Sequence, residues 1–270
     1  MLPVDLIVIR HGESEGNVAM KASRSGDNSL FTPGFRNRHS REFRLTDRGI
    51  EQAQVAGEWL RQNVHFPIDR YLVSDYIRAK ETAYHLGIQG ATWSVEYQLR
   101  ERDKALMDNL PTDEQAKLFA FEQKQYELDP FLSIPAGGGE SVAALCLRLK
   151  ADMIAHIARD YSSMRVAMVC HGHVMRALQL ELLQLGHDDF LRLDGSDEPK
   201  DKIHNCQVMW YTRRNPDDGR VQGPRLYAWR SLSPWHLRRK TDTGWVKIER
   251  KRLTNDELRK DVDRYPRHVG

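Results

Sequence analysis

The chain has 270 residues, of which 40% are hydrophobic and 29% are charged, and its formal net charge is +3. This length and composition support one large α/β domain or two smaller ones and exclude global disorder. The three cysteines are far apart and form no Cys-x-x-Cys pair, which predicts reduced thiols in a cytoplasmic protein rather than a zinc or dithiol site. The first apolar run is too short for a membrane span and follows no basic start, so we expect neither membrane insertion nor export.

The positive charge is concentrated towards the carboxyl end of the sequence. Residues 213–270 contain 16 Lys and Arg against 8 Asp and Glu, whereas the remaining chain is net acidic. Such an excess of basic residues usually forms a solvated surface. The alternative hypothesis is that this basic segment binds an acidic partner, and we do not expect it to bind nucleic acid. We predict a main α/β domain over residues 1–231 and a basic C-terminal extension over residues 232–270, packed on that domain or appended to it.

In chain order, the first predicted element is a buried strand at residues 6–9, a short, continuous and β-branched apolar run. It stops at Arg10, His11 and Gly12, and further polar side chains follow at once. In open α/β sheets, ligands bind at the carboxyl ends of the strands. This position therefore predicts a binding site.

A loop rich in arginine follows at residues 21–44, where glycine, proline and asparagine interrupt regular structure. Because this loop continues directly from the polar segment, we predict that residues 36–44 form a lid facing the substrate. Arg36 and Arg38 would then bind polyanionic substrates. Solvated surface charge is the competing interpretation.

Strands and helices alternate through the rest of the domain. We expect a polar helical insert at residues 112–128 and irregular structure at 186–202. The other predicted helices are 46–60, 78–86, 141–161 and 175–185, and the other predicted strands are 71–73, 93–97, 166–170, 207–211 and 225–229. This pattern predicts a three-layer α/β/α fold with a mostly parallel sheet, helices on both faces and the polar insert after the third strand.

The strand at residues 166–170 repeats the design of the first one. It runs directly into His171, Gly172 and His173. A single histidine after a strand is more often structural than catalytic. Two such units in one sheet favour a shared site that contains both His11 and His171.

Several short segments resemble, in the same chain order, the signature blocks of the histidine phosphatase superfamily, also called phosphoglycerate mutase-like. Each match is weak alone, but together they are specific, and they extend from the first strand to residue 211. The matching segments are residues 10–17, 74–83, 99–101, 139–141, 171–172 and 205–206.

This resemblance implies a metal-independent phosphomonoesterase that needs no cofactor and acts on a small phosphorylated metabolite or phosphorylated partner. His11 would attack phosphorus and carry the phosphoryl group as phosphohistidine, which neutral imidazole can do near neutral pH. Glu101 would be the acid for the leaving group and later the base for water. The phosphoryl charge would be bound by Arg10, Asn17, Arg78 and His171.

Two positions depart from the family pattern. Lys104 follows the acid block where relatives often carry an aromatic residue and a glycine, and His173 stands where glycine is common. Both are therefore candidate substrate-binding residues. The long basic insert that true mutases use to hold phosphoglycerates is absent after the acid block, so hydrolysis is favoured over phosphoryl return.

Three alternatives remain open at this point. The first is phosphoryl transfer of the phosphoglycerate mutase type, and the second is a non-catalytic module that binds phosphorylated ligands. The third is a metal-dependent hydrolase with His11, Glu13, His171 and His173 as ligands, although no histidine pair has the i, i+4 spacing of a common zinc site. The substrate could be a sugar phosphate, a nucleotide, a phosphoamino acid or an inositol phosphate.

Overall fold

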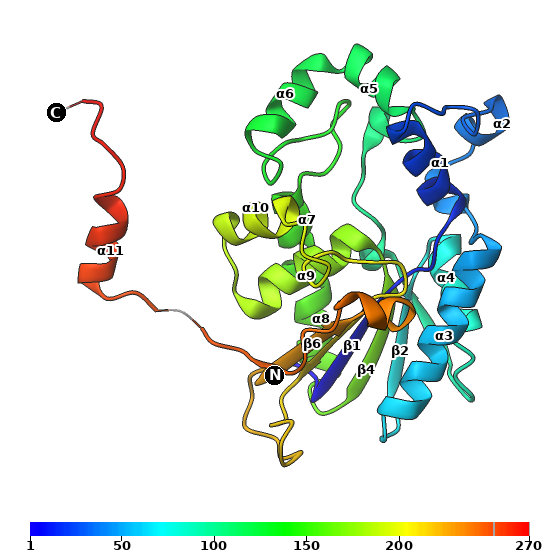
Figure 1. Cartoon of the computed structure of the whole chain (residues 1–270). Coiled ribbons are helices and arrows are strands. Elements are labelled where there is room, and N and C mark those ends of the chain that lie inside the picture. Colours follow the sequence, from blue (N-terminus) through cyan, green and yellow to red (C-terminus); the bar gives the residue numbers. More distant parts are fainter. Residues whose placement is uncertain (251, 270) are drawn as a thin grey trace.

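The computed structural model describes residues 1–250 and 252–269, so Lys251 and Gly270 of the predicted basic extension lie outside the described residues. A seven-stranded sheet in the order β3-β2-β4-β1-β5-β6-β7 forms its centre, with helices packed on its faces (Figure 1). The strands are β1 (Asp5–Arg10), β2 (Arg70–Ser74), β3 (Trp93–Glu96), β4 (Arg165–Cys170), β5 (Val208–Thr212), β6 (Ala228–Leu232) and β7 (Val246–Lys247).

The sheet is mixed. The pairs β1–β4, β2–β4 and β2–β3 are parallel. On the other side of β1, the pairs β1–β5, β5–β6 and β6–β7 are antiparallel. The predicted three-layer α/β fold is therefore confirmed, and the parallel part of the sheet is its site-bearing half. In β1 and β4, Arg10 pairs in register with Cys170, so the residues that follow both strands emerge at the same level.

Each face of the sheet has its own apolar core, because successive side chains of a strand point to opposite faces. Leu6 and Val8 of β1 belong to a core completed by α7 (Val142–Arg148), α8 (Ala155–Asp160) and α9 (Gly172–Leu183). Ile7 and Ile9 face a second core with α3 (Asp47–Asn63) and α4 (Ile77–His85). Burial on both faces explains why β1 and β4 are continuous apolar runs.

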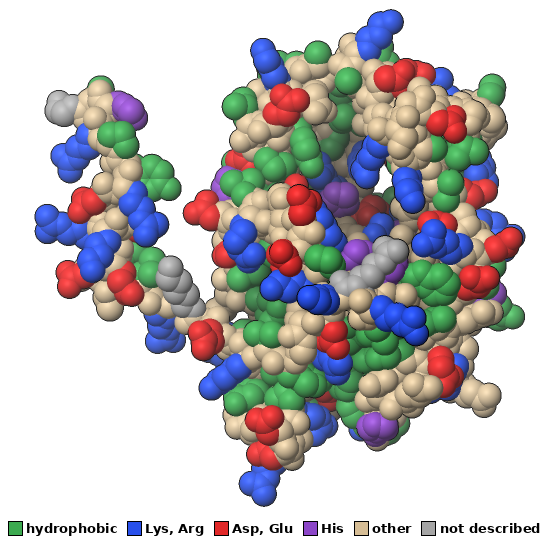
Figure 2. All heavy atoms as spheres, viewed as in Figure 1, with side chains coloured by type: hydrophobic (Ala, Val, Ile, Leu, Met, Phe, Trp, Pro, Cys, Tyr) green, Lys and Arg blue, Asp and Glu red, His purple; other side chains and the backbone are tan. Residues whose placement is uncertain are grey.

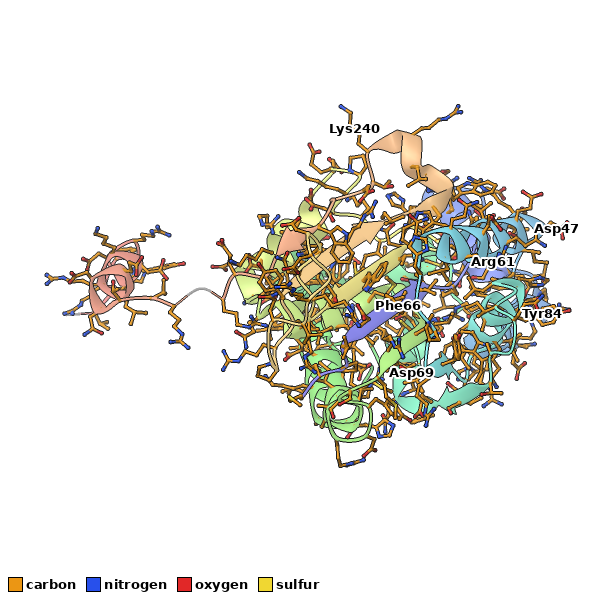
Figure 3. All side chains as sticks on the ribbon, turned by 90° about the horizontal axis from the view of Figure 1, so that it is seen from below. Asp47, Arg61, Phe66, Asp69, Tyr84 and Lys240 are labelled. Carbon is orange, nitrogen blue, oxygen red and sulfur yellow. The ribbon has the colours of Figure 1, made fainter. Side chains whose placement is uncertain are left out.

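A group of small helices lies beyond the carboxyl ends of the parallel strands (Figure 1). It comprises α1 (Glu15–Arg24), α2 (Pro33–Arg36), α5 (Thr112–Leu118) and α6 (Ala120–Leu128). Ser23 of α1 bonds to the backbone N–H and hydroxyl of Thr112 at 2.8 and 3.0 Å, which ties the polar insert to α1. Figure 3 shows the opposite end of the sheet, where Asp69 lies and pairs with Arg165 at 2.9 Å.

Several predicted boundaries differ from the structure. The predicted loop begins with α1 and contains α2 and the short helix η1 (Ser40–Glu42). The insert is two helices that meet at Phe119, and α7 and α8 are joined by a π-helical segment, η4 (Leu149–Ile154). Short 3-10 helices also occur at η2 (Tyr97–Leu99) and η3 (Ala105–Met107).

Two later segments also correct the predictions. The segment predicted to be irregular contains α10 (His187–Gly195), which forms because Phe190 and Leu193 are buried. The last predicted strand is displaced to 228–232, since pairing with β5 selects that register.

The carboxyl end of the chain has two parts. After β6, a 3-10 segment, η5 (Pro234–Arg239), packs against α3, and β7 then pairs with β6 as the last strand of the sheet. The last helix, α11 (Asn255–Val262), has no buried residue and stands apart from the sheet in Figures 1 and 3. The domain boundary at residue 231 and the acidic partner stay predictions. Within residues 1–250 and 252–269, no helix combines the length and apolarity that a bilayer crossing requires.

Candidate active site

A cavity of about 920 Å³ opens at the carboxyl ends of the parallel strands. Its lining comes from the turn after β1, from α1 and α4, from the loop after β3 and from the start of α9. Figure 2 shows this hollow with histidine side chains in its depth and Lys and Arg side chains around it. The cavity is therefore where sequence segments that are far apart meet.

His11 lies at the bottom of this cavity with only 2% of its surface exposed. Its Nδ1 is 2.7 Å from the carbonyl oxygen of Gly12, and its Nε2 is 3.1 Å from Nε of Arg78. Because the Arg78 Nε–H can only donate, Nε2 of His11 must accept this hydrogen bond. The ring proton is therefore on Nδ1, which donates to the carbonyl oxygen of Gly12. Nε2 therefore holds the free electron pair of the ring.

The surroundings keep this imidazole neutral. Burial is the largest cause that holds the pKa of His11 well below its usual value, and the positive charge of Arg78 acts in the same direction. Gly12 makes the position possible, because a Cβ there would lie 2.3 Å from the carbonyl oxygen of Gly49. The sequence requires glycine here for close backbone packing.

Two arginines flank the ring from neighbouring elements. Nη1 of Arg10 donates to the carbonyl of Ile203 at 2.6 Å, and Nη1 of Arg78 donates to the carbonyl of Ser40 at 2.8 Å. Arg10 is thus fixed by one nitrogen, whereas Arg78 is fixed by two, Nη1 on Ser40 and Nε on His11. Nε of Arg10 is buried and has no hydrogen-bond partner in the described part of the chain. A buried donor left in this state beside a cavity is suited to an anionic ligand.

His171 is fully buried and lies against His11, with ring centroids 5.2 Å apart. Its Nε2 is 2.8 Å from Oγ of Ser74, which also accepts the backbone N–H of Tyr76. The Ser74 hydroxyl can donate to Nε2 or accept from it, so this contact is compatible with either neutral tautomer of His171. Nδ1 is buried and has no hydrogen-bond partner among the described residues. Burial, followed by the charge of Arg78, holds the pKa of His171 well below its usual value.

Asn17 and Asn205 complete the polar wall on the α1 side. Oδ1 of Asn17 accepts the N–H of Ser14 at 3.2 Å and the side-chain amide of Asn205 at 3.0 Å. The same amide of Asn205 donates to the carbonyl of His11 at 3.2 Å. Asn17 is therefore held with its carbonyl engaged and lines the cavity.

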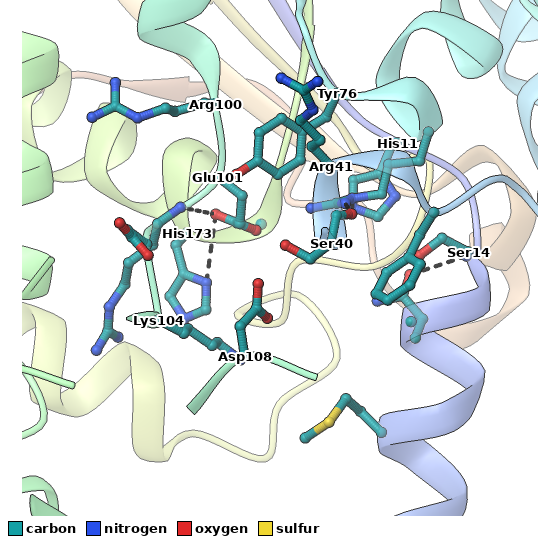
Figure 4. A pocket seen from close by; sticks show the side chains of 18 of the residues that line it. His11, Ser14, Ser40, Arg41, Tyr76, Arg100, Glu101, Lys104, Asp108 and His173 are labelled. Carbon is teal, nitrogen blue, oxygen red and sulfur yellow. Dashed lines mark hydrogen bonds and ion pairs between the residues drawn. The ribbon is translucent and has the colours of Figure 1, made fainter. Parts of the chain in front are cut away.

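Glu101 follows the third parallel strand, and its side chain is 18% exposed. Its Oε1 accepts the N–H of Arg102 at 2.9 Å and lies 3.6 Å from Nδ1 of His173 (Figure 4). Burial alone would raise the pKa of Glu101. The hydrogen bond and charge of His173, with the charge of His171 and the Arg102 N–H, nevertheless hold this pKa well below its usual value.

The structure brings most of the predicted site residues together. Seven of them line the cavity, namely Arg10, His11, Asn17, Arg78, Glu101, Lys104 and His173, and His171 packs directly behind His11.

Arg36 and Arg38 need correction, because neither lines the cavity. Arg36 forms an ion pair with Glu114, and Arg38 pairs with Glu15 at 2.9 Å. Carboxylates on α5 and α1 therefore hold both side chains outside the lining of the cavity.

Some lining residues were not identified from the sequence. Tyr76 packs against His171 with centroids 4.9 Å apart, and the Arg78 guanidinium lies 4.7 Å from its ring centroid. Tyr76 lies in the segment 74–83, which resembles a family signature block, two residues before Arg78. This position is the feature of the sequence that could have identified it as a site residue. Arg41, which belongs to the segment 36–44 predicted to form a lid, also lines the cavity.

Glu13 does not join the histidines, which bears on the metal-ligand alternative. Its carboxylate accepts the hydroxyl of Thr46 at 3.1 Å and lies 3.9 Å from Arg48. In the part of the chain that the structure describes, no group of three or more His, Cys, Asp or Glu is arranged to hold a metal ion.

Comparison with known proteins agrees with this arrangement. A sequence model of the histidine phosphatase superfamily (branch 1) matches residues 6–211. The chain is 30% identical over 183 residues to a 2,3-bisphosphoglycerate-dependent phosphoglycerate mutase of Methylorubrum populi, a match covering 66% of this chain and 78% of the mutase.

The fold is similar to that of solved phosphatases. Alpha-ribazole phosphatase from Shigella flexneri superposes with a TM-score of 0.61 at 20% identity, covering 78% of this chain and 91% of that one. Mycobacterial glucosyl-3-phosphoglycerate phosphatase in complex with VO3 superposes with a TM-score of 0.58 at 23% identity, covering 77% and 92%. At these identities the likeness concerns the fold.

Proposed function

Because the chain belongs to the histidine phosphatase superfamily, branch 1, we propose that it is a metal-independent phosphomonoesterase working through a phosphohistidine. The observation that carries the proposal is the state of His11. Its Nε2 is unprotonated, accepts a hydrogen bond from Nε of Arg78 and lies at a cavity that Arg10 also lines, where the buried Nε of Arg10 has no hydrogen-bond partner among the described residues. A phosphoryl group placed there would accept from Nε of Arg10 and meet the nucleophile.

In the first half-reaction, Nε–H of Arg78 turns its hydrogen bond from Nε2 of His11 to a phosphoryl oxygen, which frees the lone pair of Nε2. Nε2 then forms a bond to phosphorus while the bond from phosphorus to the ester oxygen breaks. Arg10 and Arg78 oppose the charge that spreads over the phosphoryl oxygens. The leaving oxygen takes a proton from Glu101. A bound phosphate adds negative charge beside Glu101 and so favours the protonated form of its carboxyl group.

In the second half-reaction, Glu101 accepts a proton from water, and the water oxygen attacks phosphorus. The bond between Nε2 and phosphorus breaks, which releases inorganic phosphate and restores neutral His11. The arginines supply the positive charge that a metal ion would otherwise provide.

A mutase of the phosphoglycerate type is the second candidate, favoured by the 30% identity to such an enzyme. Hydrolysis is better supported by the segment after Glu101, which leads into the polar insert α5–α6 and contains no long basic insert. The two reactions share the phosphohistidine and differ in what accepts the phosphoryl group: water or the substrate.

The cavity also favours a substrate with more than one negative charge. Ten of its lining residues are Lys or Arg and five are Asp or Glu. Lys104 lines the cavity beyond Glu101, where a leaving group would extend, and it forms no ion pair within the described chain. A second phosphate or a carboxylate on the leaving group fits this charge pattern.

The test is a trapped intermediate combined with a product analysis. Incubation with 32P-labelled phosphomonoester followed by rapid denaturation should leave acid-labile label on the wild-type chain and none on His11→Ala. Release of inorganic phosphate in step with ester consumption supports the hydrolase. Interconversion of phosphoglycerates primed by bisphosphoglycerate, with little phosphate released, would support the mutase. Label retained by His11→Ala would remove His11 as the nucleophile.

A further inference from the structure

The two carboxylate oxygens of Glu101 have different surroundings. Oε1 receives the Arg102 N–H at 2.9 Å and lies 3.6 Å from Nδ1 of His173, as the dashed lines in Figure 4 show. Oε2 has no hydrogen bond within the described chain, and it is not among the buried unpartnered atoms. One oxygen is thus anchored, while the other is available to a ligand in the cavity.

His173 is held firmly enough to act as an anchor. It lies in the first turn of α9, immediately before Val174 and Met175, which are fully buried. Its side chain is 40% exposed and lines the cavity. Glu101 is its ion-pair partner among the described residues. The backbone of His173 is therefore fixed by core packing, and its ring bridges Glu101 and the open cavity.

We propose that His173 is a positioning residue that binds Oε1 of Glu101 through Nδ1 and thereby directs Oε2 at the leaving oxygen. This inference rests on the proposed function and changes the expected role of His173 from substrate binding to support of the acid. The Nδ1 proton stays on His173. The proton that moves to the leaving group is the one on Oε2 of Glu101.

The contact also has a consequence for pH. Glu101 must be protonated to act as the acid, so activity falls as the pH rises through its pKa. His173 lowers that pKa by its hydrogen bond and charge, so removal of His173 should move the alkaline limb to higher pH. The other groups that face Glu101 are Arg10, Tyr76, Arg78, Arg102, Lys104, Cys170 and His171, and they stay unchanged in the variants below.

A double-mutant cycle with Glu101→Gln tests the proposal. His173→Leu removes the contact, whereas His173→Asn restores an amide donor close to the place of Nδ1. The substrates are a series of aryl phosphates from nitrophenyl to unsubstituted phenyl phosphate, because a poor leaving group depends more on the acid. His187→Asn is the matched control, since His187 also pairs with a carboxylate, Asp129 at 3.0 Å, but does not line the cavity.

We expect Glu101→Gln to slow phenyl phosphate by about 100-fold or more. His173→Leu should slow the hydrolysis of phenyl phosphate by about 10-fold, which corresponds to the lower end of the free energy of one hydrogen bond to a charged group. The loss on nitrophenyl phosphate should be much smaller. His173→Asn should recover most of that rate. In the Glu101→Gln background, His173→Leu should cause no further loss, because both changes disable the same group.

Three outcomes would overturn the proposal. If the losses multiply in the double variant, or if His173→Leu raises KM equally for all aryl phosphates, His173 binds substrate directly. An alkaline limb that stays in place in His173→Leu also contradicts it. If Glu101→Gln itself shows no dependence on the leaving group, the acid of the proposed function is wrong, which is a separate failure that the single variant reveals.

Discussion

Replacing Arg78 by methionine removes a cation that acts on both the nucleophile and the bound phosphoryl group. In the structure Nε of Arg78 donates to Nε2 of His11 at 3.1 Å, and Nη1 is fixed on the Ser40 carbonyl at 2.8 Å. Loss of one preorganised donor to developing charge usually costs about 100-fold to 1,000-fold in rate. Because Arg78 supplies a full charge as well as a donor, we expect kcat/KM to fall by about 1,000-fold in Arg78→Met.

Arg78→Lys keeps the charge and loses the planar fork, so a smaller loss of about 100-fold is expected. The pH profile should separate the two variants. Arg78 is, after burial, the largest cause of the low pKa of His11, and His11 must be neutral to attack. Without that charge the pKa of His11 rises, and the acid limb of kcat/KM moves to higher pH in Arg78→Met but much less in Arg78→Lys.

The assay is steady-state hydrolysis of nitrophenyl phosphate across the range in which imidazole titrates. Arg61→Met is the control, since Arg61 pairs with Glu58 on the outer side of α3 and its side chain is 48% exposed. An Arg78→Met variant that loses less than about 10-fold, or whose acid limb coincides with that of the wild type, would refute the role assigned to Arg78 in tuning His11.

Two further predictions concern packing and substrate charge. Gly12→Ala should abolish turnover and lower the free energy of unfolding by about 1–3 kcal/mol, because a Cβ at 2.3 Å from the Gly49 carbonyl oxygen forces the backbone to move. Urea unfolding measures the loss of stability, and a fully active Gly12→Ala variant would contradict the prediction. Lys104→Met should raise KM several-fold for bisphosphates and leave nitrophenyl phosphate nearly unchanged, and added salt should weaken the same substrates. Equal KM changes for all substrates would show that Lys104 does not select for charge.

The sequence alone determined the site-bearing half of the fold. The runs at residues 6–9 and 166–170 are continuous and β-branched, and such runs are stable when both faces of a strand are covered. Since a histidine follows each strand and parallel strands end at one edge, the sequence favoured a shared site, and the in-register pairing of β1 with β4 places the rings of His11 and His171 5.2 Å apart. The local sequence pattern is sufficient to predict these two strands, because the burial of each residue follows from its position in a strand that is covered on both faces.

Tertiary structure decided which charges face the cavity. Arg36 and Arg41 stand in one basic loop and look equivalent in sequence, yet Arg36 pairs with Glu114 while Arg41 lines the cavity. The direction of a long charged side chain depends on the carboxylates that packing brings near it. Those carboxylates lie on α1 and α5, and the distance between the loop and α5 along the chain hides the pairing.

The same reason explains the remaining differences. Residues 187–195 form α10 because Phe190 and Leu193 become buried, which outweighs a local composition typical of loops. The last predicted strand lies at 228–232 because its register is set by pairing with its neighbour β5. The partnership of Glu101 with His173 joins two segments more than 70 residues apart. Contacts between segments so far apart in the sequence depend on how the whole chain packs, and the local periodicity of the sequence does not predict them.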